Sequence, residues 1–580
     1  MAKQEKVSGR RRRFMDRMYA KLARRQKAMQ GFVSSPEPRT IGSFARGRQL
    51  IAGNLLFAGY LVESQESGLW EVNAPTSAFD DERHGFAWLD DLAAVGDLNA
   101  RALAQRWLWG WIAEYDRGSG PGWSSDLTGR RLIRWINHAL FLLRGQPPEA
   151  SEAFFTSLSR QVWYLSKRWR SAAPGLPRFE ALTGLIYAGL ALEGREGLAD
   201  PAVRALSQEC ERQIDDEGGL PTRNPEELLE VFTLLVWASA AMQEAGRGTP
   251  LAHAAAIERI APTLRALRHA DGSLARFHGG GRGLDGRLDH ALSASGIKPG
   301  LPRGLAMGFA RIQARRTSLI VDASPPPKDA ASYNAHASTM AFELSSGRRP
   351  LIVNCGSGVR FGQEWRRAGR ATPSHSAMCL SGYSSARLGE TESGTGREPL
   401  LDAAKHVPVE LSEIVDGTRF QGGHDGYVPV FGLTVARTLE LNHDGRGLAG
   451  EDMLLAMDES SRARFRRALA SATQKGLTYD IRFHLHPDVD AEVDMGGTAI
   501  SMALKSGEIW VFRHDGLAQM SIAPSVYLET GRLKPRATQQ IVLSGRATQQ
   551  ATRIRWTLAK AQDTAVAVRD LARDEPELTD

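Results

Sequence analysis

The chain has few of the features that mark a disulfide scaffold, a zinc finger or a membrane protein. Only Cys210, Cys355 and Cys379 are cysteine among its 580 residues, and no two of them form a Cys-x-x-Cys pair. This usage excludes a disulfide framework and a zinc-thiolate site, and it favours small buried apolar side chains. No run of eighteen apolar residues occurs, so the sequence predicts no transmembrane helix.

A secretory signal is also not readable. The N-terminal arginines are followed by no apolar core and no small-residue cleavage site. The sequence alone therefore predicts a cytoplasmic protein. Its length exceeds that of one ordinary core, so two or more domains are expected. Apolar content of 42% and charged content of 24% are ordinary for a globular protein.

The positive charge is concentrated at the N-terminus. The first thirty residues hold eleven Lys and Arg against Glu5 and Asp16, a net charge of +9, so the remaining chain carries −2 of the total of +7. This distribution argues against specific nucleic-acid binding by the whole protein. Residues 1–40 are predicted to be a basic tail and linker. Two alternatives stay open, a solvated tail or a helix lying on an anionic membrane surface or a nucleic acid.

The periodicity changes once along the chain. From 41 to 312 apolar residues recur at helical spacing between short Gly- and Pro-containing loops, which predicts stacked helical hairpins. From 313 to 562 short runs of period two alternate with glycine-rich turns, which predicts a large antiparallel β-sheet domain. The segment 563–580 is an acidic tail.

The most informative stretch is 333–344. Here Asn334 and His336 lead directly into the strand-like run Thr-Met-Ala-Phe-Glu-Leu. A second apolar strand ends at Asn354, and His375 follows further on. Polar residues at the edges of short strands can be gathered at one point by a sheet.

Three segments in this order resemble the C-terminal region of the heparinase II/III family of polysaccharide lyases. There they read roughly His-Gly-His-Ala-Asp with Ser-Phe-Glu-Leu, then Leu-Leu-Val-Asp-Pro-Gly, then Ala-His-Asn. The resemblance implies a two-domain α+β fold, an N-terminal (α/α) toroid of helical hairpins followed by a large antiparallel β-sheet sandwich. It also implies a cell-envelope or periplasmic location, which differs from the location read from the N-terminus.

The family's reaction is cleavage of an acidic, uronic-acid-containing glycan by β-elimination. A base removes the C5 proton, an acid protonates the leaving oxygen, and a clamp neutralises the neighbouring carboxylate. The resemblance therefore implies a lyase whose partner is an anionic polysaccharide and which requires no cofactor. The alternative is a non-catalytic glycan-binding or envelope-polysaccharide protein on the same scaffold. Oligomeric state is not readable.

On the resemblance, His336 matches the second His of the family's His-x-His, and Asn334 replaces the first. Asn334 can bind a carboxylate but cannot transfer a proton. His336 and His375 are the candidates for catalysis and for ligating a structural zinc ion. Asn354 replaces the acidic ligand, and zinc needs at least three good ligands. The other interpretation makes both histidines hydrogen-bonded structural residues.

The helical half departs further from the family. Glu227 stands where relatives carry a catalytic Tyr, and Gly175-Leu176-Pro177 replaces their Gly-Asn-His. Arg223 and Asn224 resemble a substrate-binding pair of the family. Asn224 followed by Pro225 is equally typical of a helix N-terminus, so capping is the alternative.

Two further histidine motifs lie in the β-sheet region. His424 and Tyr427 could supply acid/base chemistry, or they could flank a simple turn at Asp425-Gly426. His484 and His486 alternate on a strand and share one face. That spacing suits a metal, and an ordinary polar strand face is the alternative.

One segment combines an aromatic ring with guanidinium groups. Trp365 precedes Arg366, Arg367 and Arg370. Arg binds carboxylate and sulfate through two parallel hydrogen bonds, and Trp stacks on sugar rings. Trp365 and Arg370 are therefore predicted to bind substrate.

Overall fold

The structure is a computed structural model. It describes residues 2–34, 38–64, 68–302, 304–392, 397–472, 476–529, 532–561 and 570, and side chains from residue 11 onward. The predicted acidic tail 563–580 lies outside the described residues apart from Asp570.

The chain forms two compact units. The helical unit contains Met1–Asp215, Leu229–Ala261 and Asp289–Ile297. The β-rich unit contains Asp216–Leu228, Pro262–Leu288 and Lys298–Asp580. The domain boundaries predicted at 40, 312 and 562 remain predictions, because segments of the two units alternate along the chain before residue 298.

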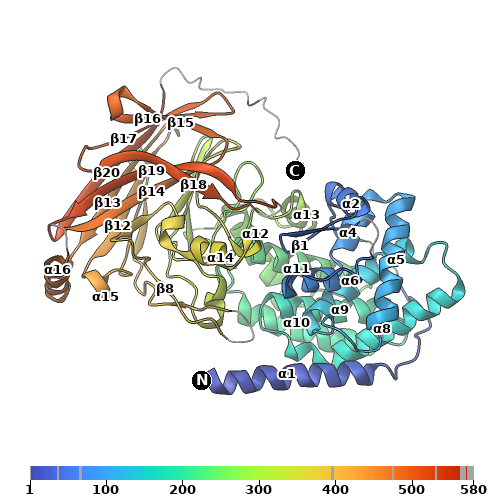
Figure 1. The fold of residues 1–580 in the computed structure, drawn as a ribbon. Helices are drawn as coiled ribbons and strands as arrows, with labels where there is room; N and C mark the ends of the chain where they lie inside the picture. Colours follow the sequence, from blue (N-terminus) through green and yellow to red (C-terminus); the bar gives the residue numbers. More distant parts are fainter. Residues whose placement is uncertain are drawn as a thin grey trace. The chain divides into compact units, whose positions relative to one another are not determined.

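The helical unit is built from helices of 5 to 22 residues joined by loops (Figure 1). They are α1 (Ala2–Ala23), α2 (Phe44–Ile51), α3 (Ser77–Gly85), α4 (Trp88–Val95), α5 (Leu98–Tyr115), α6 (Ser125–Asn137), α7 (Ala139–Leu143), α8 (Pro148–Arg168), α9 (Leu176–Ala191), α10 (Ala199–Gln213), and the larger parts of α11 (Pro225–Glu244), α12 (Leu251–Ala266) and α13 (Arg287–Ala294). A small hairpin, β1 (Asn54–Phe57) and β2 (Tyr60–Glu63), accompanies them. None of the described helices is both long and apolar enough to cross a bilayer.

Helices α6 and α9 cross at two glycines. A Cβ atom on Gly184 would lie 2.6 Å from Cα of Gly129, so neither position can carry a side chain without moving the helices apart. Beside this crossing Arg131 is fully buried, and its guanidinium lies 4.2 Å from the ring centre of Trp111. The small residues thus set how closely the helices of this core approach.

The basic N-terminal segment is a helix, α1, and the second half of it packs on α8. Ala20 is fully buried, and Asp16 Oδ1 accepts a hydrogen bond of 2.7 Å from Arg168 Nε. The rings of Tyr19 and Trp163 lie 6.0 Å apart. Residues 2–23 are therefore helical, and the contact of this helix with a membrane surface or a nucleic acid stays a prediction.

The β-rich unit contains two large antiparallel sheets. The first sheet has the order β10-β11-β12-β13-β20-β17-β16-β15, and the second has β18-β19-β14-β6-β5-β4-β3 with β7 paired to β14. The strands are β3 (Phe309–Ala314), β4 (Thr317–Asp322), β5 (Phe342–Ser346), β6 (Arg349–Val353), β7 (Met378–Leu380), β10 (Val409–Ile414), β11 (Gly417–His424), β12 (Thr434–Asn442), β13 (Gly447–Leu455), β14 (Leu477–Leu485), β15 (Val489–Asp494), β16 (Ala499–Leu504), β17 (Ile509–His514), β18 (Gln519–Tyr527), β19 (Arg536–Ala547) and β20 (Ala551–Lys560). A small pair, β8 (Arg387–Leu388) and β9 (Leu400–Leu401), and the helices α14 (Gln363–Arg370), α15 (Val428–Phe431) and α16 (Glu459–Ser471) complete it.

The two sheets face each other across one hydrophobic core. Phe342 and Phe483 of the second sheet meet Trp556 of the first, with ring centres 6.1 and 4.8 Å from that of Trp556. Strand β12 alternates buried and half-buried residues, as a strand with one covered face must. The predicted antiparallel β-sandwich is therefore observed.

A buried ion pair lies inside this core. Arg437 Nε donates to Asp452 Oδ1 at 2.7 Å, and Trp556 Nε1 donates to the other carboxylate oxygen at 2.9 Å. Arg437 Nη1 also donates to the carbonyls of Met340 and Ser376, each at 2.8 Å, which belong to loops beside the second sheet. The pair therefore ties one sheet to the loops that carry the candidate site.

We expect Asp452→Ala to lower the free energy of unfolding by about 3–5 kcal/mol, because it leaves Arg437 buried without its counter-charge. The matched control is Glu451→Ala on the outer face of the same strand. Its pair with Arg555 is mostly exposed, so the expected loss is at most about 1 kcal/mol. Urea unfolding followed by near-ultraviolet circular dichroism measures both, and equal losses would contradict the assignment.

Candidate functional site

His336 and His375 are brought together, and both are buried in the β-rich unit. Each follows a short 3-10 helix, Asp329–Asn334 and Thr372–Ser374. His336 Nδ1 and His375 Nε2 are 3.0 Å apart, and His375 Nδ1 lies 2.9 Å from the carbonyl of Ala371. Since that carbonyl can only accept, we assign the His375 proton to Nδ1. His336 then donates from Nδ1, which leaves its Nε2 with a lone pair.

A third histidine, His278, belongs to the same cluster and was missed from the sequence. The backbone N–H of His336 donates to His278 Nδ1 at 3.2 Å, and His278 Nε2 lies 3.4 Å from Asp322 Oδ2 at the end of β4. His278 has a φ of 48° and precedes three glycines, 279–281. That glycine run after a histidine is the signal that could have found it. We call His278, His336, His375 and Asp322 the histidine cluster.

The charge of the histidine cluster follows from its burial. Burial, with His375 and His278 nearby, holds the pKa of His336 well below its usual value, and burial lowers the pKa of His375 to about 4. Burial alone would raise the pKa of Asp322, but Arg223 and His278 outweigh it and lower that pKa. The imidazoles are thus neutral at pH 7 around one ionised carboxylate.

The predicted zinc site does not fit these residues. His336 and His375 direct Nδ1 and Nε2 at each other rather than at a shared ion, and Asn354 stands at the position of the acidic ligand that the resemblance implies. Asn354 Oδ1 accepts from the backbone N–H of Ser376 at 3.0 Å. Over the described ranges, no three His, Cys, Asp or Glu side chains are grouped so that they could hold a metal ion.

Arg223 and Asn224 are engaged within the protein. Asn224 Oδ1 accepts the backbone N–H groups of Glu226 and Glu227 at 3.0 and 3.2 Å, so it caps α11 as the capping alternative proposed. Arg223 Nη2 donates to Asp322 Oδ1 at 2.6 Å. The other donors of Arg223 bind the backbone carbonyls of Met307, Gly308, Ser324 and Pro325.

The predicted substrate residues near α14 differ in exposure. Arg370 is buried, and its guanidinium donates to the backbone carbonyls of Ser332, Ala335 and Glu398 at 2.8–2.9 Å. Trp365 is half-buried and Asn334 is exposed. Asn334 and Trp365 can meet a ligand, whereas Arg370 holds its own loop together.

His424 and Tyr427 do not join the histidine cluster. Tyr427 is buried in the sandwich core, its hydroxyl donates to the carbonyl of Tyr383 at 3.0 Å, and burial raises its pKa well above its usual value. His424 Nδ1 accepts from the backbone N–H of Gly426 at 3.2 Å, and burial lowers the pKa of His424 to about 4. These contacts fit the turn alternative, because neither side chain is presented to a ligand.

His484 and His486 occupy different surroundings rather than one metal site. His484 Nε2 lies 2.9 Å from the carbonyl of Pro373 and its Nδ1 lies 2.7 Å from Ser525 Oγ. His486 follows the end of β14 and packs edge-on against Tyr527, with ring centres 4.9 Å apart.

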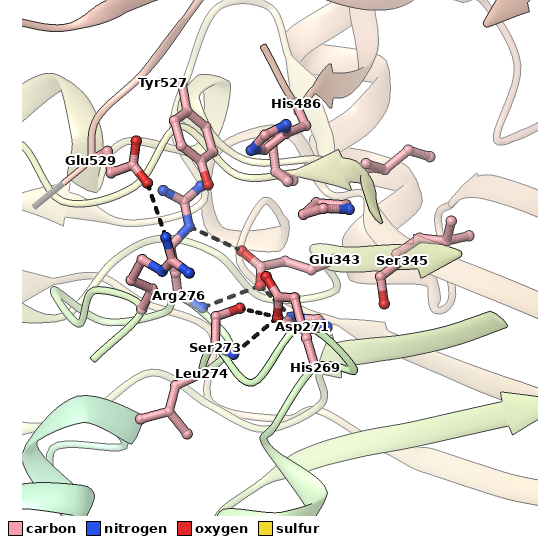
Figure 2. Close-up of a pocket in the computed structure, with 15 residues that line it drawn as sticks. His269, Asp271, Ser273, Leu274, Arg276, Glu343, Ser345, His486, Tyr527 and Glu529 are labelled. Carbon is pink, nitrogen blue, oxygen red and sulfur yellow. Dashed lines mark hydrogen bonds and ion pairs between the residues drawn. The ribbon is translucent and has the colours of Figure 1, made fainter. Parts of the chain in front are cut away.

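Beside His486 lies a polar pocket of about 60 Å³, entirely within the β-rich unit. Figure 2 shows its polar side chains converging from several loops and strands. By this measure a water needs roughly 10–15 Å³, so the pocket admits a small polar group rather than a whole sugar ring. The polar residues that define it here are His269, Arg276, Glu343, His486, Tyr527 and Glu529.

Glu343 is the buried acid of the polar pocket. Its Oε2 accepts from His269 Nε2 at 3.0 Å and from the backbone N–H of Arg276 at 3.2 Å. Burial alone would raise the pKa of Glu343, but His269 and Arg276 outweigh it and lower that pKa. Asn354 Nδ2 lies 3.5 Å from its other oxygen, so this pocket adjoins the loop of the histidine cluster.

Two side chains of the polar pocket can donate to a ligand. They are Tyr527, through its hydroxyl, and His486, through Nε2, because its Nδ1 accepts from the backbone N–H of Asp488 at 3.2 Å. The guanidinium of Arg276 lies 3.9 Å from the ring centre of Tyr527. Burial raises the pKa of Tyr527 to about 12 and lowers that of His486 to about 4. At neutral pH both groups are uncharged donors.

Comparison with known proteins agrees with this architecture. The sequence profile described as "Heparinase II/III-like, C-terminal" matches residues 296–557. A curated relative, FtsZ-localized protein C of Caulobacter vibrioides (strain NA1000 / CB15N), is 30% identical over 551 residues, which are 92% of this chain and 91% of the relative. The chain belongs to the heparinase II/III-like family.

Solved structures of this family share the fold. A heparinase III structure superposes with a TM-score of 0.68 at 12% identity, covering 97% of this chain and 92% of that one. A heparan sulfate lyase HepC from Pedobacter heparinus gives 0.55 at 13% identity, covering 95% and 88%. The predicted order of a helical toroid followed by an antiparallel β-sandwich is confirmed.

We expect the stability of the chain to fall as the pH drops from 6.5 toward 4. His375 is held neutral in the folded state, with its pKa lowered from 6.5 to about 4, so protons bind the unfolded chain first. His375→Gln should flatten this fall, whereas His406→Gln, at an exposed position, should leave it unchanged. Urea midpoints measured between pH 4 and 7.5 test this, and an unaltered fall in His375→Gln would contradict it.

Proposed function

We propose that this protein binds an acidic glycan on the lyase scaffold without cleaving it. This is the second of the two functions that the sequence left open. The observation that carries it is the internal engagement of Arg223 and Tyr427, the guanidinium and the phenol predicted to handle substrate.

β-Elimination needs a carboxylate clamp, a base and an acid at one place. The guanidinium donors of Arg223 are already hydrogen-bonded to Asp322 and to backbone carbonyls, and the phenol of Tyr427 is buried in the core. His336 Nε2 keeps a lone pair, but the lowered pKa of His336 makes it a weak base. Glu227 stands where relatives carry a Tyr acid. Asn334 remains exposed and can bind a carboxylate, but a carboxylate-binding group and one weak base without an acid support binding better than elimination.

Binding has better support in the polar pocket. Tyr527 and His486 offer two uncharged donors, and Arg276 lies against the phenol ring. The carboxylate of Glu343 is compensated by His269 and Arg276, so a ligand oxygen need not meet an unpaired negative charge there. A carboxylate or hydroxyl group of a sugar matches this donor set. The family's solved members include heparan sulfate lyases, which favours an acidic glycan.

We expect no rise in ultraviolet absorbance from an unsaturated product when the purified chain meets heparan sulfate or alginate, because the elimination groups are engaged elsewhere. Calorimetry should instead detect binding, and Tyr527→Phe should weaken it by about 1 kcal/mol, the net value of one hydrogen bond. Tyr383→Phe is the control, because Tyr383 is 57% exposed and lies outside the pocket.

Two outcomes would count against this function. An absorbance rise that His336→Ala abolishes would restore the lyase. Equal affinities of Tyr527→Phe and Tyr383→Phe would remove the polar pocket as the binding site.

The exposed face of α1 favours a second function, attachment to an anionic membrane surface. Arg11, Arg13 and Arg17 are exposed along this part of the helix, and the side chain of Phe14 is 66% exposed among them. Arg12 is also exposed and donates to the carbonyl of Ser171. The opposite face is held on α8. A helix with an apolar side chain among arginines suits anionic lipid headgroups. The relative's printed name reports localization with FtsZ, and we propose the same location for this chain.

We expect Arg11→Glu combined with Arg13→Glu to reduce binding to phosphatidylglycerol vesicles by at least about tenfold, since each basic residue near such a surface contributes about 1 kcal/mol. Arg204→Glu combined with Arg212→Glu makes the same charge change on exposed positions of α10 and should bind normally. Vesicle sedimentation measures this, with co-localization of a fluorescent fusion with FtsZ as the second readout. An equal loss of vesicle binding in both double variants would contradict a specific role of α1, because net charge alone would then explain the binding.

A further inference from the structure

Two hairpin turns of the second sheet lie side by side and bring arginines together. The β3–β4 hairpin turns at Arg315 and Arg316, and the β5–β6 hairpin turns at Gly347 and Arg348. The backbone N–H of Gly347 donates to the carbonyl of Arg316 at 2.6 Å, so the turns are in contact. Each is a two-residue turn whose first residue, Arg315 or Gly347, has a positive φ.

A groove of about 440 Å³ lies at these turns, and it is far roomier than the polar pocket. Its charged lining consists of four arginines and one carboxylate, and we call it the arginine groove. The charged residues are Arg311, Arg315, Arg316, Arg348 and Asp570.

The carboxylate comes from the end of the chain. Asp570 receives two hydrogen bonds from Arg349, Nε to Oδ2 at 2.7 Å and Nη2 to Oδ1 at 2.9 Å. Arg348 Nη2 lies 3.7 Å from the same carboxylate. The side chains of Arg349 and Asp570 are only 6% and 7% exposed. This paired geometry is the strong form of an arginine–carboxylate contact, and it shows that this end of the sheet accepts a peptide carboxylate.

The residues that follow have the matching charge. Positions 571–580 carry Asp574, Glu575, Glu577 and Asp580 against Arg573 alone. Their placement lies outside the described residues. A segment of net charge −3 therefore starts beside a groove lined by four arginines, with Asp570 at its edge.

We propose that the arginine groove is a binding site for a short acidic peptide, and that its resident occupant is the chain's own C-terminal segment after Asp570. The exposed Arg315 and Arg348 supply guanidinium groups to the carboxylates of the peptide, and Asp570 on Arg349 sets the starting point. Arg311 instead donates to the carbonyls of Ala266 and Arg268. This site is separate from the histidine cluster and from the polar pocket. It does not depend on the glycan or membrane functions.

The test uses a fluorescein-labelled synthetic peptide with the sequence of residues 570–580 and the full chain. A tethered occupant acts at millimolar effective concentration, so the added peptide should bind the wild-type chain weakly. Asp570→Asn removes the anchor and should tighten peptide binding by at least about fivefold. Arg315→Glu combined with Arg348→Glu should weaken binding to the Asp570→Asn chain by a similar factor. Fluorescence anisotropy at low ionic strength measures each, and high salt should abolish binding.

The matched control is Arg466→Glu combined with Arg467→Glu, the same charge change on exposed positions of α16. Arg315 and Arg348 are exposed, so replacing both in the Asp570→Asn chain should leave its melting by circular dichroism unchanged. Equal peptide binding by the groove and control variants would overturn the proposal. So would binding of a heparin oligosaccharide but not of the acidic peptide, which would assign the groove to glycans.

Discussion

One buried carboxylate, Asp322, holds together the segments that carry the candidate site. It lies at the end of β4, accepts hydrogen bonds from Arg223 and Ser338 at 2.6 and 2.7 Å, and lies 3.4 Å from His278. Desolvation makes an ionised carboxylate costly unless it is fully paired, so removing any of these donors would penalise the fold. This arrangement has a functional consequence, because Arg223, which neutralises Asp322, cannot also bind a substrate.

The same principle explains why several groups predicted to act on substrate are engaged within the protein. Buried guanidinium, phenol and imidazole groups must find internal partners, and here they find backbone carbonyls and one another. Arg370 binds three carbonyls, Tyr427 binds two, and His336 binds His375. Tyr527 and His486 line the polar pocket, where their side chains can donate to a ligand. Packing and internal hydrogen bonds thus hold the buried groups of the scaffold in place.

Charge is distributed over three separate surfaces. The exposed arginines of α1 surround Phe14, the arginine groove surrounds Asp570, and the polar pocket balances its acids against its own bases. Only the first is apparent as a run of sequence. The arginines of the groove come from strand β3, the β3–β4 turn and the β5–β6 turn, and they gather because β4 and β5 are neighbours in one sheet. Local composition therefore reveals the basic N-terminal segment, but it does not reveal the arginine groove.

The sequence by itself determined the fold class, since helical spacing changes to period two near residue 313 and the motif at 333–344 matches a known family. It also placed His336 and His375 together, because each follows a short turn before a strand that enters the same sheet. Only the tertiary structure decided which groups are accessible. His278 joins the cluster from a glycine-rich loop with no helical or strand periodicity, and Tyr427 points into the core. Whether a side chain can bind a ligand depends on hydrogen-bond partners that are distant in the chain, such as Asp322 for Arg223. No local sequence pattern encodes these partners.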